Sequence, residues 1–137
     1  MQIGIDIDGT LTDIIDVLNN AAYNYAKILG KQVDIHRESI QSFEKLYKDY
    51  YSFFNSELKC FMLNIQEEII KNIMPRDNVK ETILKLKNKG YKIYIITSRS
   101  KGYHKDPYQI SYDWLVKNEI YFDELIVNVN DKLKMLF

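Results

Sequence analysis

The chain has 137 residues, with 19 lysines and arginines against 19 aspartates and glutamates, so its formal net charge is zero. This length allows one domain with a sizeable core, and the balanced charge argues against a surface that binds nucleic acid polymers. The single cysteine, Cys60, excludes an internal disulfide and suits a reducing compartment. No signal peptide and no apolar run of about 20 residues is found, which predicts a soluble cytoplasmic protein without a membrane partner.

The first predicted elements are a strand and a helix. In "QIGIDID" (2–8) isoleucines alternate with glycine and aspartates, which is strand spacing with β-branched residues. Apolar residues then recur at helical spacing up to Leu29. Asp13 is a suitable N-cap for this helix and Gly30 a suitable stop.

Residues 34–74 contain no glycine, and from Ile40 onward apolar residues recur at every third or fourth position. They predict an insertion of two or three helices, with a break near "FNSE" (54–57) and an end at Pro75. Aromatic side chains at this spacing usually belong to a core, and a stacking surface for a ligand is the less common alternative. We expect this core role for the following residues: Phe43, Tyr47, Tyr50, Tyr51 and Phe54.

The remaining chain alternates helices and strands. A helix over 77–89 precedes a β-branched strand over 91–98, and a helix from Pro107 precedes a strand over 124–129. "DKLKMLF" (131–137) begins a further helix. This order predicts an α/β fold with parallel strands and crossover helices.

Two carboxylates and a glycine follow the first strand. In an open parallel sheet, ligands bind at the carboxyl ends of the strands, where Asp6 and Asp8 are expected. Two nearby carboxylates repel each other, and a hard cation such as Mg²⁺ would offset this cost. Gly9 would allow a tight turn over the site. Alternatively, D-x-D-G is only turn chemistry at a strand end.

"IGIDIDGTLTD" (3–13) resembles the first motif of the haloacid dehalogenase superfamily of phosphohydrolases, an apolar strand followed by DxDGT. "KIYIITSRS" (92–100) is similar to the second motif, a strand ending in Thr or Ser, and "YDWLVKNEIYFDELIV" (112–127) is most similar to the cytosolic 5'-nucleotidase and 5'(3')-deoxyribonucleotidase branch. The resemblance implies a Rossmann-like α/β core from residues 1–13 and 75–137, with a small helical cap over 14–74 inserted after the first strand.

The resemblance also implies roles for individual residues. Asp6 would be the nucleophile that forms an aspartyl-phosphate, and Asp8 the general acid–base, with both contributing to a Mg²⁺ site. Thr97, assisted by Ser98, would donate hydrogen bonds to phosphoryl oxygens. A lysine of the third motif would neutralise the transferred group, and Lys132 matches its placement, with Lys134 as the alternative.

One part of the family pattern is absent. The fourth motif, a pair of acidic residues after a further strand, would follow the lysine, but the sequence ends at Phe137. We therefore expect an incomplete sheet in which the Asp6 strand is an edge that could pair with a second copy of the chain in a homodimer. A truncated sequence, completion by a partner chain and a degenerate relative remain three open explanations.

The resemblance implies a Mg²⁺-dependent phosphomonoester hydrolase that acts on a small phosphorylated substrate such as a nucleotide. The alternative is a relative without catalysis that acts as an interaction module through its open sheet edge. A third interpretation is a plain α/β domain with turn aspartates. Arg99 could contact a substrate phosphate or form a surface ion pair, and Cys60 is expected to be a buried structural thiol.

Overall fold

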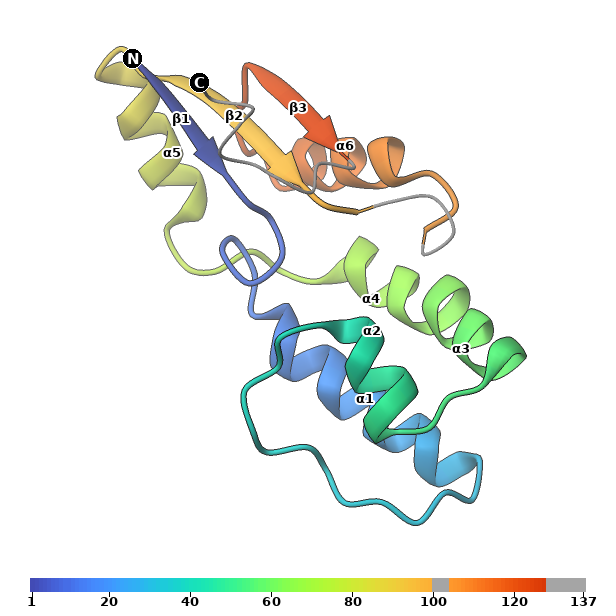
Figure 1. Ribbon diagram of the computed structural model, residues 1–137. Helices are drawn as coiled ribbons and strands as arrows, with labels where there is room; N and C mark the ends of the chain where they lie inside the picture. Colours follow the sequence, from blue (N-terminus) through green and yellow to red (C-terminus); the bar gives the residue numbers. More distant parts are fainter. Residues whose placement is uncertain (100–103, 128–137) are drawn as a thin grey trace. The chain divides into compact units, whose positions relative to one another are not determined.

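The computed structural model describes residues 1–99 and 104–127. The chain divides into two compact units, which Figure 1 shows. The sheet unit comprises Met1–Asp13 and Lys71–Phe137, and the helical unit comprises Ile14–Ile70. None of the helices in the described ranges combines the length and the apolar character needed to cross a membrane.

The sheet unit is built on three parallel strands. These are β1 (Gln2–Ile5), β2 (Lys92–Thr97) and β3 (Glu124–Val127), in the order β1-β2-β3. All three point the same way in Figure 1, so their carboxyl ends lie at one edge. The predicted α/β fold with a parallel sheet is confirmed. Among the described strands β1 pairs on one side only, so the sheet is short and open, as expected.

Two helices provide the crossovers of this unit. Helix α5 (Val79–Asn88) contacts β2, and α6 (Pro107–Lys117) contacts β3. Pro107 opens α6, and the Asp106 carboxylate caps it by accepting a hydrogen bond of 3.1 Å from the Gln109 amide. Together with the strands these helices bury an apolar cluster: Ile7, Leu11, Ile83, Ile93, Ile95, Trp114, Leu115, Ile120 and Leu125.

The helical unit begins with α1 (Ile14–Ile28), which ends before Gly30 as predicted. Two composite helices follow, and each contains a wider π-helical stretch. The first consists of α2 (Phe43–Lys45) and η1 (Leu46–Tyr50), and the second of α3 (Asn55–Cys60), η2 (Phe61–Gln66) and α4 (Glu67–Asn72), whose last two residues belong to the sheet unit. The predicted break near residues 54–57 is present, with positive φ angles at Ser52 and Asn55.

The helical insertion predicted over 34–74 begins later than expected. Residues 31–42 are a loop, and helical structure resumes only at Phe43, where the Ser42 side chain accepts a hydrogen bond from the Lys45 amide. Side chains elsewhere in the unit bind the loop backbone. The Asn19 amide donates to the His36 carbonyl, and the Tyr50 hydroxyl donates to the Asp34 carbonyl. These contacts replace the hydrogen bonds that a helix would have provided.

The aromatic residues of this unit divide between core and surface. Tyr47 and Tyr51 are fully buried, which confirms the predicted core role, and their rings contact Phe53 and Phe61. Tyr50 and Phe54 are exposed instead, because they lie where helical structure stops. The expectation of a buried thiol is wrong: the Cys60 side chain is exposed, and its sulfur accepts a hydrogen bond from Asn64.

Candidate functional site

The chain turns sharply where β1 ends. The strand stops at Ile5, and the backbone then forms a single turn in which the amides of Thr10 and Leu11 both donate to the Ile7 carbonyl. Gly9 has a φ of 81°, a left-handed conformation that glycine adopts without steric cost. The buried Ile7 side chain anchors the turn in the apolar cluster. As a result, the half-buried Asp6 and Asp8 carboxylates lie beyond the carboxyl end of the strand.

A partly buried ion pair joins this turn to the end of β2. The Arg99 guanidinium donates from Nε to one Asp8 oxygen at 3.1 Å and from a terminal nitrogen to the other at 2.7 Å. The Arg99 side chain is 3% exposed and the Asp8 side chain 27%. Two segments 91 residues apart are therefore held together by the two-pronged geometry that suits an arginine and a carboxylate.

A third side chain fixes the arginine. The Ser111 hydroxyl, from the first turns of α6, accepts a hydrogen bond of 3.0 Å from another terminal nitrogen of Arg99. The same hydroxyl donates to the Pro107 carbonyl at 2.7 Å and is fully buried. The guanidinium thus has polar partners on two sides, which a buried cation requires.

The other predicted site residues lie close by in the chain. The Asp6 carboxylate accepts a hydrogen bond of 2.8 Å from the amide of Ile7. Thr97 is the last residue of β2 and is buried, and its hydroxyl oxygen accepts a 3.5 Å hydrogen bond from the Arg99 amide. A hydroxyl that accepts one hydrogen bond can still donate another. Ser98 is exposed.

Arg76 holds the far end of the turn. Its amide donates to the Leu11 carbonyl at 2.7 Å, and its guanidinium contacts the Gly9 carbonyl at 3.1 Å and the Asp13 carboxylate at 3.0 Å. Residues 9–13 lead from the sheet unit into the helical unit, and Arg76 lies on the return connection. The two connections are therefore bound to each other within the sheet unit.

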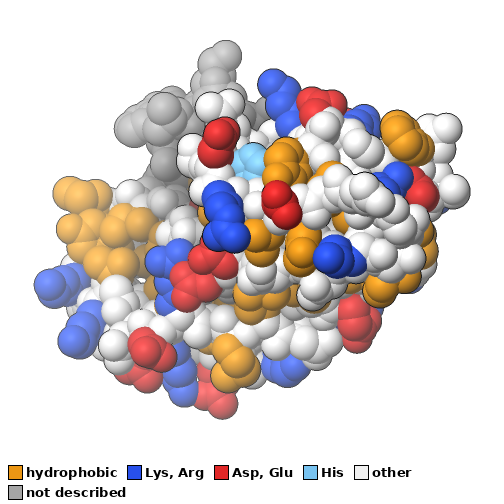
Figure 2. Space-filling view, turned by 90° about the horizontal axis from the view of Figure 1, so that it is seen from below, with side chains coloured by type: hydrophobic (Ala, Val, Ile, Leu, Met, Phe, Trp, Pro, Cys, Tyr) orange, Lys and Arg blue, Asp and Glu red, His pale blue; other side chains and the backbone are white. Residues whose placement is uncertain are grey.

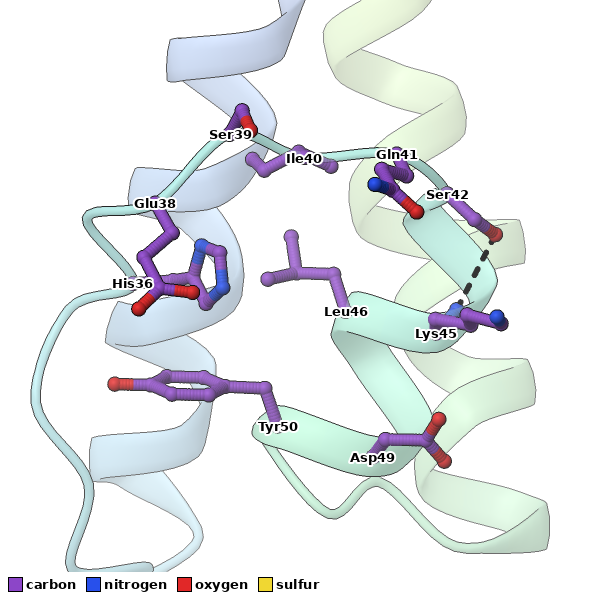
Figure 3. A pocket seen from close by; sticks show the side chains of 10 residues that line it. All are labelled: His36, Glu38, Ser39, Ile40, Gln41, Ser42, Lys45, Leu46, Asp49 and Tyr50. Carbon is purple, nitrogen blue, oxygen red and sulfur yellow. Dashed lines mark hydrogen bonds between the residues drawn. The ribbon is translucent and has the colours of Figure 1, made fainter.

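The helical unit contains a pocket of its own, with a volume of about 370 Å³. Figure 3 shows His36 from the loop facing Leu46 and Tyr50 from η1, and the His36 ring meets the Tyr50 ring edge to face at 4.6 Å. Among the described residues, the buried Nδ1 of His36 has no hydrogen-bond partner. The full lining is His36, Glu38, Ser39, Ile40, Gln41, Ser42, Lys45, Leu46, Asp49 and Tyr50.

Charges are mixed on the face of the molecule that Figure 2 presents. Lysines and arginines alternate there with aspartates and glutamates, and the charged groups do not segregate by sign.

A family profile for haloacid dehalogenase-like hydrolases matches residues 3–109, which include the turn after β1, β2 and the helices between them. The chain belongs to this family.

Sequence relatives agree with this assignment. A protein of Oceanobacillus iheyensis named "Putative nucleotidase" is 32% identical over 121 residues, which cover 87% of this chain and 60% of that protein. The chain therefore spans less than two thirds of the length of this curated relative.

Solved structures share the fold at lower identity. A "putative beta-phosphoglucomutase" from Thermotoga maritima superposes with a TM-score of 0.58 at 18% identity, covering 95% of this chain and 63% of that one. A superfamily hydrolase from Geobacter sulfurreducens gives a TM-score of 0.54 at 18% identity, with coverages of 98% and 71%. These likenesses confirm the Rossmann-like architecture of the haloacid dehalogenase family.

Sequence reasoning missed the environment of Arg99. It weighed a substrate contact and a surface ion pair, whereas the side chain is buried and paired with Asp8. It also missed Ser111, because a serine in the first turns of a helix carries no sign of a partner that far away. Lys132 and Lys134 lie outside the described residues.

Asp6 and Asp8 differ in whether their carboxylates could hold Mg²⁺. Within residues 1–99 and 104–127, no three side chains of His, Cys, Asp or Glu gather into a metal-binding group. Magnesium typically takes only one or two carboxylates and completes its shell with waters and substrate phosphate oxygens. Asp6 fits such a site as one carboxylate, whereas both oxygens of Asp8 already accept hydrogen bonds from Arg99.

Proposed function

We propose that the chain hydrolyses small phosphomonoesters through an aspartyl-phosphate on Asp6, with Asp8 as the general acid–base. The observation that carries the proposal is the ion pair between Asp8 and Arg99, because it holds the first-motif turn against the end of β2. Asp6, Asp8 and Thr97 follow or end neighbouring parallel strands, which is where an open α/β sheet binds its ligands.

The reaction would proceed in two steps. In the first, an Asp6 oxygen attacks phosphorus as the bond to the leaving oxygen breaks, and protonated Asp8 gives its proton to that oxygen. In the second, ionised Asp8 takes a proton from a water molecule that attacks the aspartyl-phosphate. This releases inorganic phosphate and restores the Asp6 carboxylate.

Hydrogen-bond donors and a cation would assist these steps. We assign Thr97 and Ser98 as donors to the phosphoryl oxygens, and Lys132 as the group that offsets their charge. Asp6 and the backbone carbonyl of Asp8 would hold Mg²⁺. When bound, the ion neutralises charge on the phosphoryl oxygens.

The name of one relative supports a substrate class. The curated relative is named as a nucleotidase, which supports a nucleotide as the phosphomonoester. We assign residues 14–74 as the cap of the enzyme, which would restrict the site to small substrates.

The proposal is tested by hydrolysis of 4-nitrophenyl phosphate and of nucleoside 5'-monophosphates, with and without Mg²⁺. We expect Mg²⁺-dependent release of phosphate by the wild-type chain. Asp6→Asn should abolish this release, because an amide is not a usable nucleophile here. Asp16→Asn, an exposed position on α1, is the matched control. Full turnover by Asp6→Asn would contradict the role of Asp6.

The open edge of β1 supports a second candidate function. Among the described strands, β1 has a neighbour only at β2, and a free strand edge can pair with another chain. We propose that two copies pair along β1. Analytical ultracentrifugation at micromolar concentration should then show a dimer, and a monomer across the concentration range would exclude it.

A further inference from the structure

We infer that Arg99 is a positioning residue for Asp8 and that Ser111 in turn holds Arg99 in place. This relay, the hydrogen bonds from Ser111 through Arg99 to Asp8, sets the direction in which Asp8 exchanges its proton. The inference rests on the proposed function, since it concerns the proposed acid–base residue. Arg99 and Ser111 thereby gain a role in orienting Asp8, in addition to the roles proposed for Asp6, Asp8 and Thr97.

The contact geometry determines how the carboxylate is oriented. Arg99 reaches both Asp8 oxygens, at 3.1 and 2.7 Å, so the plane of the carboxylate is set by the plane of the guanidinium. Two oxygens offer about four lone-pair sites, and the arginine uses one on each. The remaining sites are available to a substrate oxygen or to water while Arg99 stays in place.

The burial of the pair is one-sided. The Arg99 side chain is 3% exposed, whereas 27% of the Asp8 side chain is open to solvent. The arginine is thus on the interior side, and the open side of Asp8 is where proton exchange can take place. A buried ion pair contributes little net stability, because removing both charges from water costs about as much as their attraction returns. Stability alone therefore does not explain why the fold buries Arg99.

Ser111 makes the arginine rigid. Its hydroxyl accepts from Arg99 at 3.0 Å while donating to the Pro107 carbonyl at 2.7 Å, which orients the hydroxyl within α6. Loss of this hydroxyl would free the guanidinium to tilt. Its effect on catalysis would pass through Arg99.

The relay predicts an effect that depends on the leaving group. Expulsion of an alkoxide requires a proton from Asp8, whereas 4-nitrophenolate leaves without one. A misdirected Asp8 should therefore slow hydrolysis of ethyl phosphate much more than that of 4-nitrophenyl phosphate. General acid catalysis contributes about 10²- to 10⁴-fold, so a partial loss of alignment should be visible.

The experiment measures kcat/KM of the full chain for both esters in the variants Arg99→Lys and Ser111→Ala. Arg99→Lys keeps the charge but cannot form the two-pronged contact. We expect its kcat/KM for ethyl phosphate to fall about tenfold or more beyond the fall for 4-nitrophenyl phosphate. Ser111→Ala should show the same selectivity with a loss of about threefold to tenfold. Exposed Lys117→Arg, at the other end of α6 from Ser111, is the control and should change neither ester.

Other outcomes separate the inference from the proposed function. Equal losses for both esters in the two variants would assign Arg99 and Ser111 a purely structural role and overturn the inference, while Asp6→Asn still tests the hydrolase itself. A wild-type chain that hydrolyses neither ester would overturn both. Trp114 fluorescence shows whether each variant is folded, and if Arg99→Lys unfolds, the milder Ser111→Ala variant still decides the question.

Discussion

The hydroxyl of Tyr51 donates a hydrogen bond of 2.6 Å to Oδ1 of Asn19, a residue on α1 that lies 32 positions earlier in the chain. The same hydroxyl accepts from the His36 amide at 3.0 Å, and the Asn19 amide donates to the His36 carbonyl at 2.8 Å. Burial raises the pKa of Tyr51, which keeps the donating proton in place. The Tyr51 hydroxyl, the Asn19 side chain and the His36 backbone are thus each hydrogen-bonded to the other two. This buried set fixes the 31–42 loop on α1.

Tyr51→Phe should lower the free energy of unfolding of the chain by about 1–3 kcal/mol, because it leaves buried partners on Asn19 and His36 unsatisfied. Urea denaturation followed by circular dichroism measures the change. Tyr50→Phe is the matched control. Its hydroxyl also binds a loop carbonyl, that of Asp34 at 3.0 Å, but at an exposed position where water can replace it. Equal losses in the two variants would contradict the importance of the buried set.

This loop also shows why part of the fold could not be predicted. The strands and the helices α1, α5 and α6 follow from local periodicity and from end signals such as Gly30 and Pro107. The helical spacing of apolar residues begins at Ile40, within the 31–42 segment, yet the backbone of this segment binds distant side chains. Tertiary contacts of this kind override local preference, and no pattern in the segment announces them.

The site divides in the same way. The positions of Asp6, Asp8 and Thr97 at the ends of β1 and β2 were predictable, because a strand and the turn after it are local features. The partner of Asp8 was not, since Arg99 lies 91 residues away and its pairing depends on the register between β1 and β2. A charged residue after a strand usually lies on the surface, and only the folded structure shows that Arg99 is buried.

Arg76 provides a second stability test, at the base of the first-motif turn. Its ion pair with Asp13 is exposed, with side-chain exposures of 46% and 76%, so Asp13→Asn should change the free energy of unfolding by less than about 1 kcal/mol. Arg76→Ala also removes the contact with the Gly9 carbonyl and should cost about 1–2 kcal/mol. Urea denaturation measures the free energy of unfolding of both variants. An equal loss in Asp13→Asn and Arg76→Ala would show that the Gly9 contact contributes nothing.

Asp123 gives the chain a predicted sensitivity to acid. Hydrogen bonds from the Tyr121 hydroxyl and from the Ile93 amide, at 2.6 and 2.7 Å, lower the pKa of Asp123 below its ordinary value of 3.8. A carboxyl with a lowered pKa in the folded state stabilises the fold above its unfolded pKa. That contribution is lost as the pH falls through the folded pKa.

Asp123→Asn should therefore reduce stability at pH 7 and make the remaining stability less dependent on pH below about pH 4. Unfolding by urea at several pH values, followed by Trp114 fluorescence, measures both effects. Glu124→Gln, at the exposed neighbouring position, is the control and should leave the acid dependence of the wild-type chain intact. An unchanged slope in Asp123→Asn would show that other carboxyl groups determine the acid response.

Among the described residues, three helices end with a residue of positive φ, and at one of them this residue is not a glycine. At the ends of α1 and α5, Gly30 and Gly90 adopt φ angles of 78° and 93°, whereas Glu119 takes this position after α6 with a φ of 57°. At α6 the Glu119 amide donates to the Val116 carbonyl and the Ile120 amide to the Leu115 carbonyl, a closure that favours glycine.

Glu119→Gly should therefore raise the melting temperature, by about 2–6 °C for a chain of this size, because the left-handed conformation strains any residue with a Cβ. The substitution also removes the ion pair with Lys80, but that pair is exposed and contributes little. The reciprocal variant Gly90→Glu should lower the melting temperature. No atom lies within 4 Å of a Cβ added at Gly90, so only backbone strain would be introduced. Differential scanning calorimetry measures both changes, and a lower melting temperature for Glu119→Gly would show that the Lys80 ion pair outweighs the strain.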